Sequence, residues 1–560
     1  MNGRRWIERR LAARVASLAC ACLGVAPFGA PCVRPAAADG PAVADPFQRV
    51  ALGDAAAVVA SLADGYRKAA LDVRTARLYQ DLRLEAGQSG PLVDETKAAY
   101  PEPRAVVGQY LLGRLAPRKD VDGALQRLVP LVAPADLGML LLDQAWASLR
   151  GDNLPHALAL LPKTKKLTAD LEETVLLEAQ IIEAGGDRSA AERLLASYCA
   201  AHPDAIDARR AWSDVLIALR RVGDAAAVAE QGLVRARAPT FLAGRAAVAL
   251  EMLDFDAAKK FLDEAKDAGR PTVRAEVLAL RSAVRLAAKD TPGAEAAARA
   301  GLAASPASVP ALRALARALE VGGKPAEALA RLDDALALRP GSARLLTDRA
   351  IVLHALGQDR DAKRALTEAR KRDPAYLESL LYQGIIAEDD GDWVGAEKAY
   401  RAVLKIDPDR LEAHRMLGGV LFTMGKLEPA GAEAQWIRDR YPKDAHAWFL
   451  SGRVELKGDR FDEALAAFDK AVECEPKYAL GHVGRGWVLE EQAKPEDARK
   501  AYEAAIAADP TMPLPHRYLG ELLEEKGDNP DAARHYKAYL DLGGADPDED
   551  VRHAVDRLSK

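Results

Sequence analysis

The C-terminal half of this chain has a period of 34 residues, and no other feature of the sequence constrains the fold as strongly. Proline, alanine and a small residue each return at this step. Columns that stay in phase over so many copies indicate an array of equivalent units, because each unit must bury its apolar face against the next. The columns are Pro306, Pro340, Pro374, Pro408, Pro442, Pro476 and Pro510; Ala294, Ala328, Ala362, Ala396, Ala430, Ala464, Ala498 and Ala532; and Ser282, Ala316, Ala350, Gly384, Gly418, Gly452, Gly486 and Gly520.

Each column has a mechanical role in a helical hairpin. Two helices approach closely only where the facing side chains are small, as at Gly452 and Ala464. Proline lacks an N–H and therefore ends the second helix before the next unit begins. The residue four positions after the alanine is large in most units and fills the space toward the next hairpin. It is Leu332, Leu366, Tyr400, Phe468, Tyr502 or Tyr536, with Ala298 and Ala434 as the exceptions.

The unit that begins near Trp448 carries the fullest version of the pattern. Its residues Trp448, Gly452, Phe461, Ala464, Phe468, Ala471 and Pro476 resemble the tetratricopeptide repeat (TPR) family, although the turn residue Gly458 lies one position early. The resemblance covers residues 275–546 clearly. It implies an all-α, right-handed α-solenoid of about thirteen helix-turn-helix repeats with helical end caps and a concave binding groove.

The remaining segments differ in how well they keep the columns. We expect a signal peptide at 1–38, an N-terminal helical cap or divergent repeats at 39–102, and divergent TPR-like repeats at 103–274. The regular array follows at 275–546, and a C-terminal capping helix at 547–560. The repeats before residue 275 vary in spacing, so their register stays open.

The first 38 residues have the order of an export signal. Arg4 and Arg5 lie in a basic start, an apolar stretch follows, and Ala36-Ala37-Ala38 gives a small-x-small pattern. This order is typical of a signal peptide cleaved after Ala38 and predicts a periplasmic or secreted protein. The sequence leaves the Sec and twin-arginine routes open. An arginine-rich transit peptide and an uncleaved anchor are the alternatives.

Removal of the predicted signal makes the chain more acidic. Lys plus Arg falls from 78 to 72 and Asp plus Glu from 83 to 82, so the formal net charge changes from −5 to −10. This balance disfavours a nucleic-acid-binding face. No later stretch approaches the ~20 apolar residues of a membrane span. The two remaining cysteines, Cys199 and Cys474, predict no disulfide framework.

Sequence motifs for catalysis, nucleotide binding and metal binding are missing from the chain. This predicts a protein that is not an enzyme and has no cofactor and no metal. The nearest match to a phosphate loop, Gly419 to Leu427, has one residue too many and is interpreted as a hairpin turn. His414, His482 and His516 share the column of Trp448. Neighbouring units lie ~10 Å apart, so these histidines cannot bind one ion.

One side of the first helix in each unit is expected to line the groove. It carries aromatic and arginine side chains in a chain that is only 5% aromatic. Such side chains dominate binding hot spots. The alternative is that they pack against the next repeat. The predicted partner-binding residues are Arg415, Phe422, Phe449, Arg453, Trp487 and Arg517.

We therefore expect a non-catalytic scaffold whose partners are protein or peptide segments. The resemblance to exported bacterial TPR solenoids implies a role in the cell envelope, such as polysaccharide export or envelope biogenesis. The alternative is an accessory subunit that recruits substrate to a separate enzyme, such as a glycosyltransferase. The oligomeric state is left open.

The N-terminal pattern gives the first testable prediction. The mature protein should begin at Asp39 and lie outside the cytoplasm, because the signal peptidase cleaves after the small-x-small site. N-terminal sequencing of the purified protein, combined with cell fractionation, measures both. Recovery of an intact Met1 region from soluble cytosol would contradict the prediction.

Overall fold

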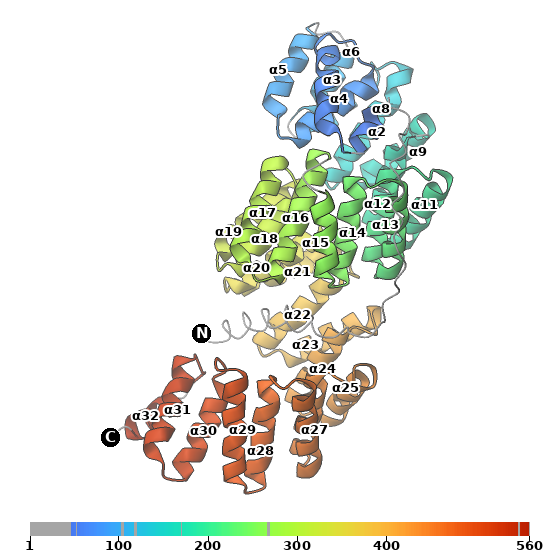
Figure 1. Cartoon of the computed structure of the whole chain (residues 1–560). Helices are drawn as coiled ribbons and strands as arrows, with labels where there is room; N and C mark the ends of the chain where they lie inside the picture. Colours follow the sequence, from blue (N-terminus) through green and yellow to red (C-terminus); the bar gives the residue numbers. More distant parts are fainter. Residues whose placement is uncertain are drawn as a thin grey trace, which may run out of the picture. The chain divides into compact units, whose positions relative to one another are not determined.

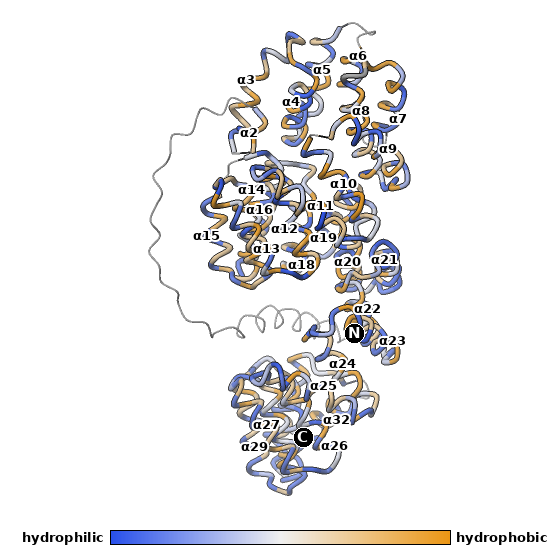
Figure 2. Tube along the Cα trace, turned by 90° about the vertical axis from the view of Figure 1, so that its right-hand side faces the viewer, coloured by the Kyte–Doolittle hydropathy of each residue, from blue (hydrophilic) through white to orange (hydrophobic). Residues whose placement is uncertain are grey.

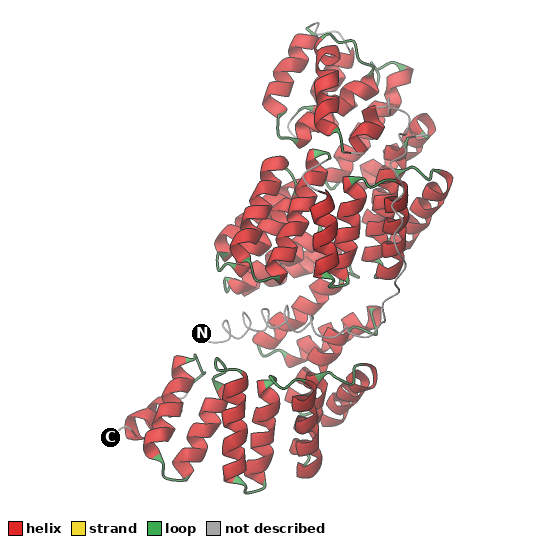
Figure 3. Ribbon diagram, in the orientation of Figure 1, coloured by secondary structure: helices red, strands yellow, loops and turns green. Residues whose placement is uncertain are grey.

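A computed structural model describes residues 46–51, 53–101, 106–116, 120–169, 171–265, 269–546 and 549–558. These residues form 31 helices and no strand. Figure 3 shows short loops between many of the successive helices of the described residues. The predicted all-α array of stacked helical hairpins is confirmed. The predicted signal peptide lies outside the described residues.

The described residues divide into two compact units, 46–358 and 359–558. The first unit contains α2 (Pro46–Ala51), α3 (Ala55–Arg67), α4 (Val73–Glu85), α5 (Ser89–Ala99), α6 (Val106–Arg114), α7 (Val121–Gln126), α8 (Pro134–Arg150), α9 (Leu154–Thr168), α10 (Glu172–Ala184), α11 (Arg188–Ala201), α12 (Ile206–Ala218), α13 (Val222–Arg235), α14 (Pro239–Glu251), α15 (Phe255–Ala265), α16 (Pro271–Ala287), α17 (Thr291–Ala304), α18 (Val309–Val321), α19 (Pro325–Leu338) and α20 (Ala343–Ala355).

The second unit contains α21 (Asp359–Arg372), α22 (Leu377–Asp389), α23 (Trp393–Ile406), α24 (Leu411–Thr423), α25 (Leu427–Arg440), α26 (Ala445–Lys457), α27 (Phe461–Cys474), α28 (Ala479–Glu491), α29 (Pro495–Ala508), α30 (Leu514–Glu525), α31 (Asn529–Asp541) and α32 (Asp550–Leu558). In Figure 1 the hairpins from α26 to α31 stand side by side. The predicted C-terminal capping helix corresponds to α32, and the segment boundaries at 102 and 547 fall outside the described residues.

A left-handed residue closes the turn inside each hairpin of the regular array. It is glycine in most units, for example Gly425 with φ 73°. In the unit with Gly458, the left-handed residue is Asp459, with φ 58°, while Gly458 caps α26 with φ −95°. The expectation that Gly458 makes the turn is therefore wrong. The chain keeps the periodic position of the turn, and aspartate tolerates the left-handed region better than most residues with side chains.

The small column and the large column meet inside the four hairpins that pair a glycine with an aromatic ring. A Cβ atom added to Gly452 would lie only 2.6 Å from the ring carbon Cε1 of Phe468, so the ring leaves no room for a side chain there. Tyr400 and Gly384 make the same contact in α22 and α23. The Phe468 ring also abuts Gly484 in the next first helix. One fully buried ring therefore joins the two helices of a hairpin and the following hairpin.

A polar contact repeats at the junction between hairpins. Trp448 donates from Nε1 to the carbonyl of Pro442 at 2.9 Å, and His414 donates from Nε2 to the carbonyl of Pro408 at 2.9 Å. His482 makes the equivalent contact to Pro476 at 3.1 Å. The proline ends one helix, and the first helix of the next hairpin satisfies its carbonyl.

The first helices of successive hairpins lie against one another. α24 contacts α26, and α26 contacts α28, while each second helix also touches the first helix of the next hairpin. The first helices α24, α26 and α28 therefore form one continuous row in this part of the stack. Figure 2 shows apolar and polar residues alternating along the helices, as expected where one face of each helix is buried.

The N-terminal helices of the first unit also contact the array. Glu85 at the end of α4 pairs with Arg270 before α16 and accepts from the Thr272 hydroxyl at 3.1 Å. The Gly269 N–H donates to the carbonyl of Gly53 at 3.1 Å. These contacts join segments between 185 and 216 residues apart in sequence. None of the described helices combines the length and the apolar character that a bilayer crossing needs.

The contact between glycine and ring predicts opposite effects for two similar substitutions. Gly486→Ala should lower the free energy of unfolding by about 1–3 kcal/mol, because the new Cβ overlaps the fully buried ring of Tyr502. Gly419→Ala should raise it by roughly 0.5–1 kcal/mol, because nothing lies within 4 Å and alanine favours the helix. Urea unfolding of both variants measures the difference. Equal effects would show that the ring does not fill this space.

Candidate functional site

The candidate site lies on the first helices α24, α26, α28 and α30 of the second unit. It is a continuous strip of side chains, which we call the Arg453 strip and define as Phe422, Arg453, Phe449, Trp487 and Tyr518. The sequence analysis predicted the first four as groove residues. Helical periodicity puts them on one side of successive first helices, and the stacking of these helices brings them together. Their role in binding stays a prediction.

Arg453 is the centre of the strip. Its guanidinium carbon lies 3.9 Å from the ring centroid of Phe422 and 5.7 Å from that of Phe449. Within the part of the chain that the structure describes, it makes neither a hydrogen bond nor an ion pair. Burial lowers the pKa of the Arg453 guanidinium from its usual value, although nearby Tyr478 and Tyr518 oppose this effect. A cation on an aromatic face without a carboxylate is prepared to accept an anionic group.

The aromatic part of the strip continues from α26 to α30. The ring centroids of Phe449 and Trp487 are 6.2 Å apart, and those of Trp487 and Tyr518 are 5.7 Å apart with the planes at 81°. Phe449 is only 6% exposed and contacts Phe468 in the core. It therefore supports the strip from below, whereas Phe422 and Trp487 are partly exposed and form its accessible surface.

The other two predicted arginines already have acidic partners. Arg415 pairs with Asp444, whose side chain is 2% exposed and also caps α26 by accepting from the Ala447 N–H at 2.9 Å. Arg517 pairs with Glu521, one turn along α30, at 2.9 Å. The three predicted arginines thus differ in whether they have an acidic partner. Arg453 is unpaired among the described residues, while Arg415 and Arg517 are neutralised within the chain.

A patch of carboxylates lies beside the C-terminal end of the strip. Burial raises the pKa of Glu490 from its usual value, and the neighbouring charges of Glu521, Glu525 and Glu491 add to the shift, while a hydrogen bond from Tyr502 opposes it. Close like charges raise one another's pKa because ionising the second carboxyl costs more. The site therefore has a cationic end at Arg453 and an acidic end at Glu490.

Sequence reasoning missed three contributors to this site: Tyr518, Asp444 and the grouping of acids around Glu490. Tyr518 lies outside the columns expected to face the groove, and its ring on α30 meets the ring of Trp487 on α28 only in the folded chain. Asp444 has the sequence signature of a helix N-cap, which explains one of its two contacts. Its pairing with Arg415 crosses 29 residues and has no local signal.

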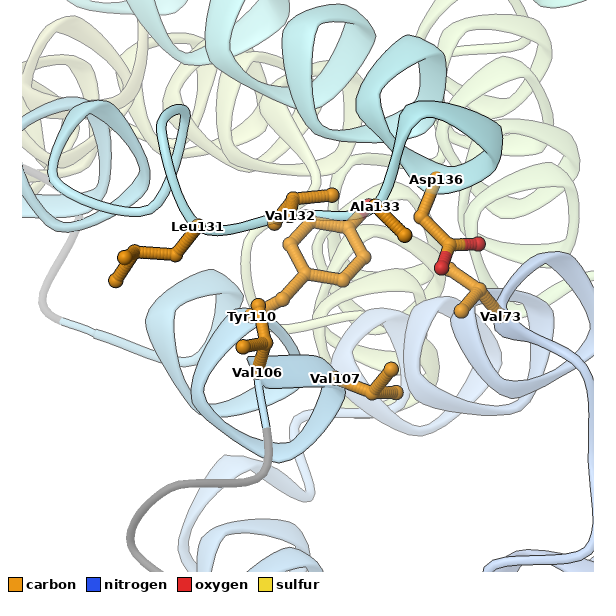
Figure 4. A pocket seen from close by; sticks show the side chains of 8 residues that line it. All are labelled: Val73, Val106, Val107, Tyr110, Leu131, Val132, Ala133 and Asp136. Atoms are coloured by element: carbon orange, nitrogen blue, oxygen red, sulfur yellow. The ribbon is translucent and has the colours of Figure 1, made fainter.

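The other cavities and reactive groups do not suggest catalysis. Figure 4 shows an apolar cavity of about 150 Å³ in the first unit, where the ring of Tyr110 lies beneath Val132 and Ala133 and only Asp136 adds a carboxylate. Burial raises the pKa of the Cys199 thiol to about 11, which leaves it protonated and unreactive near neutral pH. Across the described ranges, no three His, Cys, Asp or Glu side chains gather as metal ligands would.

Comparisons with known proteins agree with the repeat pattern. The family described as tetratricopeptide repeat matches residues 347–410, 412–479 and 483–549. A TPR repeat-containing protein of Treponema pallidum (strain Nichols) is 27% identical over 128 residues, which is 23% of this chain and 16% of that protein. The match therefore spans less than a fifth of the relative's length.

Several solved structures match this chain over part or most of its length. Yeast Tom70 is 15% identical with a TM-score of 0.41, and the match covers 85% of this chain and 96% of Tom70. The Cut9–Hcn1 hetero-tetramer of APC/C is 14% identical with a TM-score of 0.38, over 77% of this chain and 97% of that one. MamA is 26% identical with a TM-score of 0.24, over 28% of this chain and 93% of MamA.

The two paired arginines predict a contrast in stability. Asp444→Ala should lower the free energy of unfolding by about 2–4 kcal/mol, because it removes a helix cap and leaves Arg415 without its buried partner. Arg517→Ala should change it by roughly 0–1 kcal/mol, since its pair with Glu521 is solvent-exposed. Chemical unfolding of both variants tests this. A large loss for Arg517→Ala would mean that its pair is structural.

Proposed function

Since the chain is a tetratricopeptide-repeat protein, and such repeats indicate a protein–protein interaction scaffold, we propose that it holds a segment of a partner polypeptide against the Arg453 strip. The scaffold is non-catalytic, as is general for this family. The segment carries an apolar side chain, which packs on Phe422 and Trp487, and a carboxylate, which pairs with Arg453. The single observation that carries the proposal is the half-buried, unpaired guanidinium of Arg453 on the ring of Phe422.

The chemistry of the strip favours such a segment. The guanidinium has already lost part of its hydration, so a carboxylate recovers more interaction energy there than at a fully exposed arginine. Stacking on Phe422 restricts the side chain of Arg453 before the partner arrives, which lowers the entropic cost of binding. Aromatic and arginine side chains together are the composition of an interface hot spot.

The acidic patch gives the bound segment a direction. A basic side chain of the partner would lie beside Glu490 and Glu521, while its carboxylate lies beside Arg453. The reverse orientation would place like charges together at both ends and is therefore disfavoured. We accordingly expect an extended or helical segment in which acidic, apolar and basic residues follow one another.

We place this scaffold in the bacterial cell envelope, on the basis of the N-terminal signal pattern. Its partner would belong to polysaccharide export or envelope biogenesis. The alternative is an accessory subunit that recruits substrate to a separate enzyme, such as a glycosyltransferase. Affinity capture from envelope extract, followed by mass spectrometry, distinguishes the two, because the first predicts structural or export proteins and the second a single transferase.

The binding proposal predicts which side chains matter. Trp487→Ala and Arg453→Ala should each weaken binding of the captured partner at least about tenfold, because each removes a hot-spot contact. Arg453→Lys should weaken it less, since the charge remains while the planar guanidinium is lost. The measurements are calorimetric affinity and a thermal melt for each variant.

Two controls separate binding from folding. Arg364→Ala removes an exposed arginine of α21 and should change neither affinity nor stability appreciably. Phe449→Ala should lower the melting temperature, because its ring is buried against Phe468. If Trp487→Ala melts early yet keeps its affinity per folded molecule, Trp487 belongs to the core and the strip does not bind the partner.

A further inference from the structure

The same slot between hairpins occurs twice in this chain with different contents. By slot we mean the space beside the first helix of a hairpin. There, a side chain of that helix donates a hydrogen bond to the carbonyl of the proline that follows the preceding helix. A constant offset of 205 residues relates α12 and α13 to α24 and α25, including both helix starts and the preceding proline. The two slots are therefore equivalent positions in the repeat, and each serves as a reference for the other. Their residues are Pro203, Arg209, Val228 and Gln231 in one and Pro408, His414, Glu433 and Trp436 in the other.

The second slot is closed and electrically balanced. The rings of His414 and Trp436 stack with their centroids 3.5 Å apart and their planes at 19°. His414 donates from Nε2 to the Pro408 carbonyl at 2.9 Å and contacts the Glu433 carboxylate through Nδ1 at 2.5 Å. The aromatic stack fills the space, and the carboxylate provides a counter-charge for the imidazole when it is protonated.

The first slot has a permanent cation and no counter-charge. Arg209 replaces the histidine, is 4% exposed, and donates from Nη2 to the Pro203 carbonyl at 3.0 Å. Its Nη1 donates to Gln231 at 3.4 Å, and its Nε is buried without an acceptor. Val228 occupies the position of Glu433. A buried guanidinium without a carboxylate is costly, because the protein replaces only part of the hydration that it has lost.

The neighbouring carboxylates have other partners. Glu192 on α11 accepts from Trp212 at 3.2 Å and lies 3.6 Å from Arg221. Glu172 accepts from the backbone N–H of Ala208 at 2.7 Å. Across the described residues, no carboxylate contacts Arg209. The guanidinium of Arg209 therefore has no directly paired carboxylate among the described residues.

The missing aromatic stack leaves a cavity beside this cation. Gln231 stands where Trp436 closes the other slot, and the resulting space has a volume of about 230 Å³. A second guanidinium reaches it from Arg235, whose nearest carboxylate, Asp204, is 3.7 Å away. The cavity is lined by Cys199, Pro203, Arg209, Trp212, Gln231 and Arg235, among other residues. It combines a buried unpaired cation, a second cation and an amide in one small space.

We propose that this cavity is a carboxylate-binding site. The ligand carboxylate takes the place that the Glu433 side chain has in the equivalent slot and pairs with Arg209, with Arg235 and Gln231 beside it. A carboxylate is favoured because its two oxygens match the planar fork of a guanidinium. The site is about the size of a small organic acid or one acidic side chain. It lies in the first unit and does not depend on the binding role of the Arg453 strip.

The test uses the full chain labelled with 5-fluorotryptophan and titrated with sodium acetate at constant ionic strength. Trp212 lines the cavity, and Trp212→Phe identifies its fluorine signal. The Trp212 signal should shift saturably with acetate. Arg209→Gln should weaken this binding about tenfold or more, because a charge-assisted hydrogen bond is lost. Arg235→Gln should weaken acetate binding by a smaller factor than Arg209→Gln does. This second variant keeps the test possible if Arg209→Gln fails to fold.

Two further variants make the comparison specific. Val228→Glu restores the internal carboxylate of the equivalent slot, so it should abolish the acetate response and raise the melting temperature. Val228→Gln introduces a side chain of the same shape as glutamate but without its charge, so this variant should keep the acetate response. Arg193→Gln removes an exposed arginine from α11 and should leave the response unchanged.

The competing outcomes are distinct. The site would be overturned if the unmodified chain showed no saturable shift. It would also be overturned if Arg209→Gln and Arg235→Gln both bound acetate as well as the unmodified chain does. A response to inorganic phosphate without one to acetate would overturn the carboxylate assignment. Retention of full acetate binding in a folded Val228→Glu variant would show that the two slots are not equivalent.

Discussion

Four hairpins of the regular array depend on an aromatic ring that fills the space left by a glycine in the first helix, namely Tyr400, Phe468, Tyr502 and Tyr536. Phe468 packs against Gly452 in its own hairpin and against Gly484 in the next one. Because the ring is fully buried and touches both hairpins, the internal geometry of a hairpin and its stacking are set by the same contact. A larger residue in the glycine column disturbs both at once. This constraint explains why the two columns keep the same phase.

The polar contact at the proline carbonyl completes this arrangement. At three junctions, a side chain in the column of Trp448 satisfies the carbonyl of the proline that follows the preceding helix. The backbone is therefore fixed by a few columns, and the remaining positions on the first helices are free to differ between units. The Arg453 strip occupies such positions. Phe422 and Trp487 pack on the neighbouring core and stay partly exposed, and Arg453 makes no ion pair among the described residues.

In a repeat protein, an unusual residue can be compared with the residue at the equivalent position of another repeat. The pair of slots at Arg209 and His414 has the same backbone position and the same contact to a proline carbonyl. One contains an acid and an aromatic stack, while the other has valine and glutamine at those positions. The difference in charge balance is thus visible without any other protein as a standard. It indicates that units of one array can take different roles while the hairpin geometry stays the same.

The sequence by itself determined the helical hairpins, their period, their turns and the columns that pack them, because all of these depend on local spacing. The same spacing correctly grouped Phe422, Arg453 and Trp487 on neighbouring first helices. Only the tertiary structure decided which of the predicted arginines is unpaired. Asp444 neutralises Arg415 across 29 residues, Phe449 is buried beneath the strip, and Tyr518 joins it from outside the expected columns. Periodicity fixes which face a residue occupies, but its charge partners and depth depend on contacts between helices that no local pattern encodes.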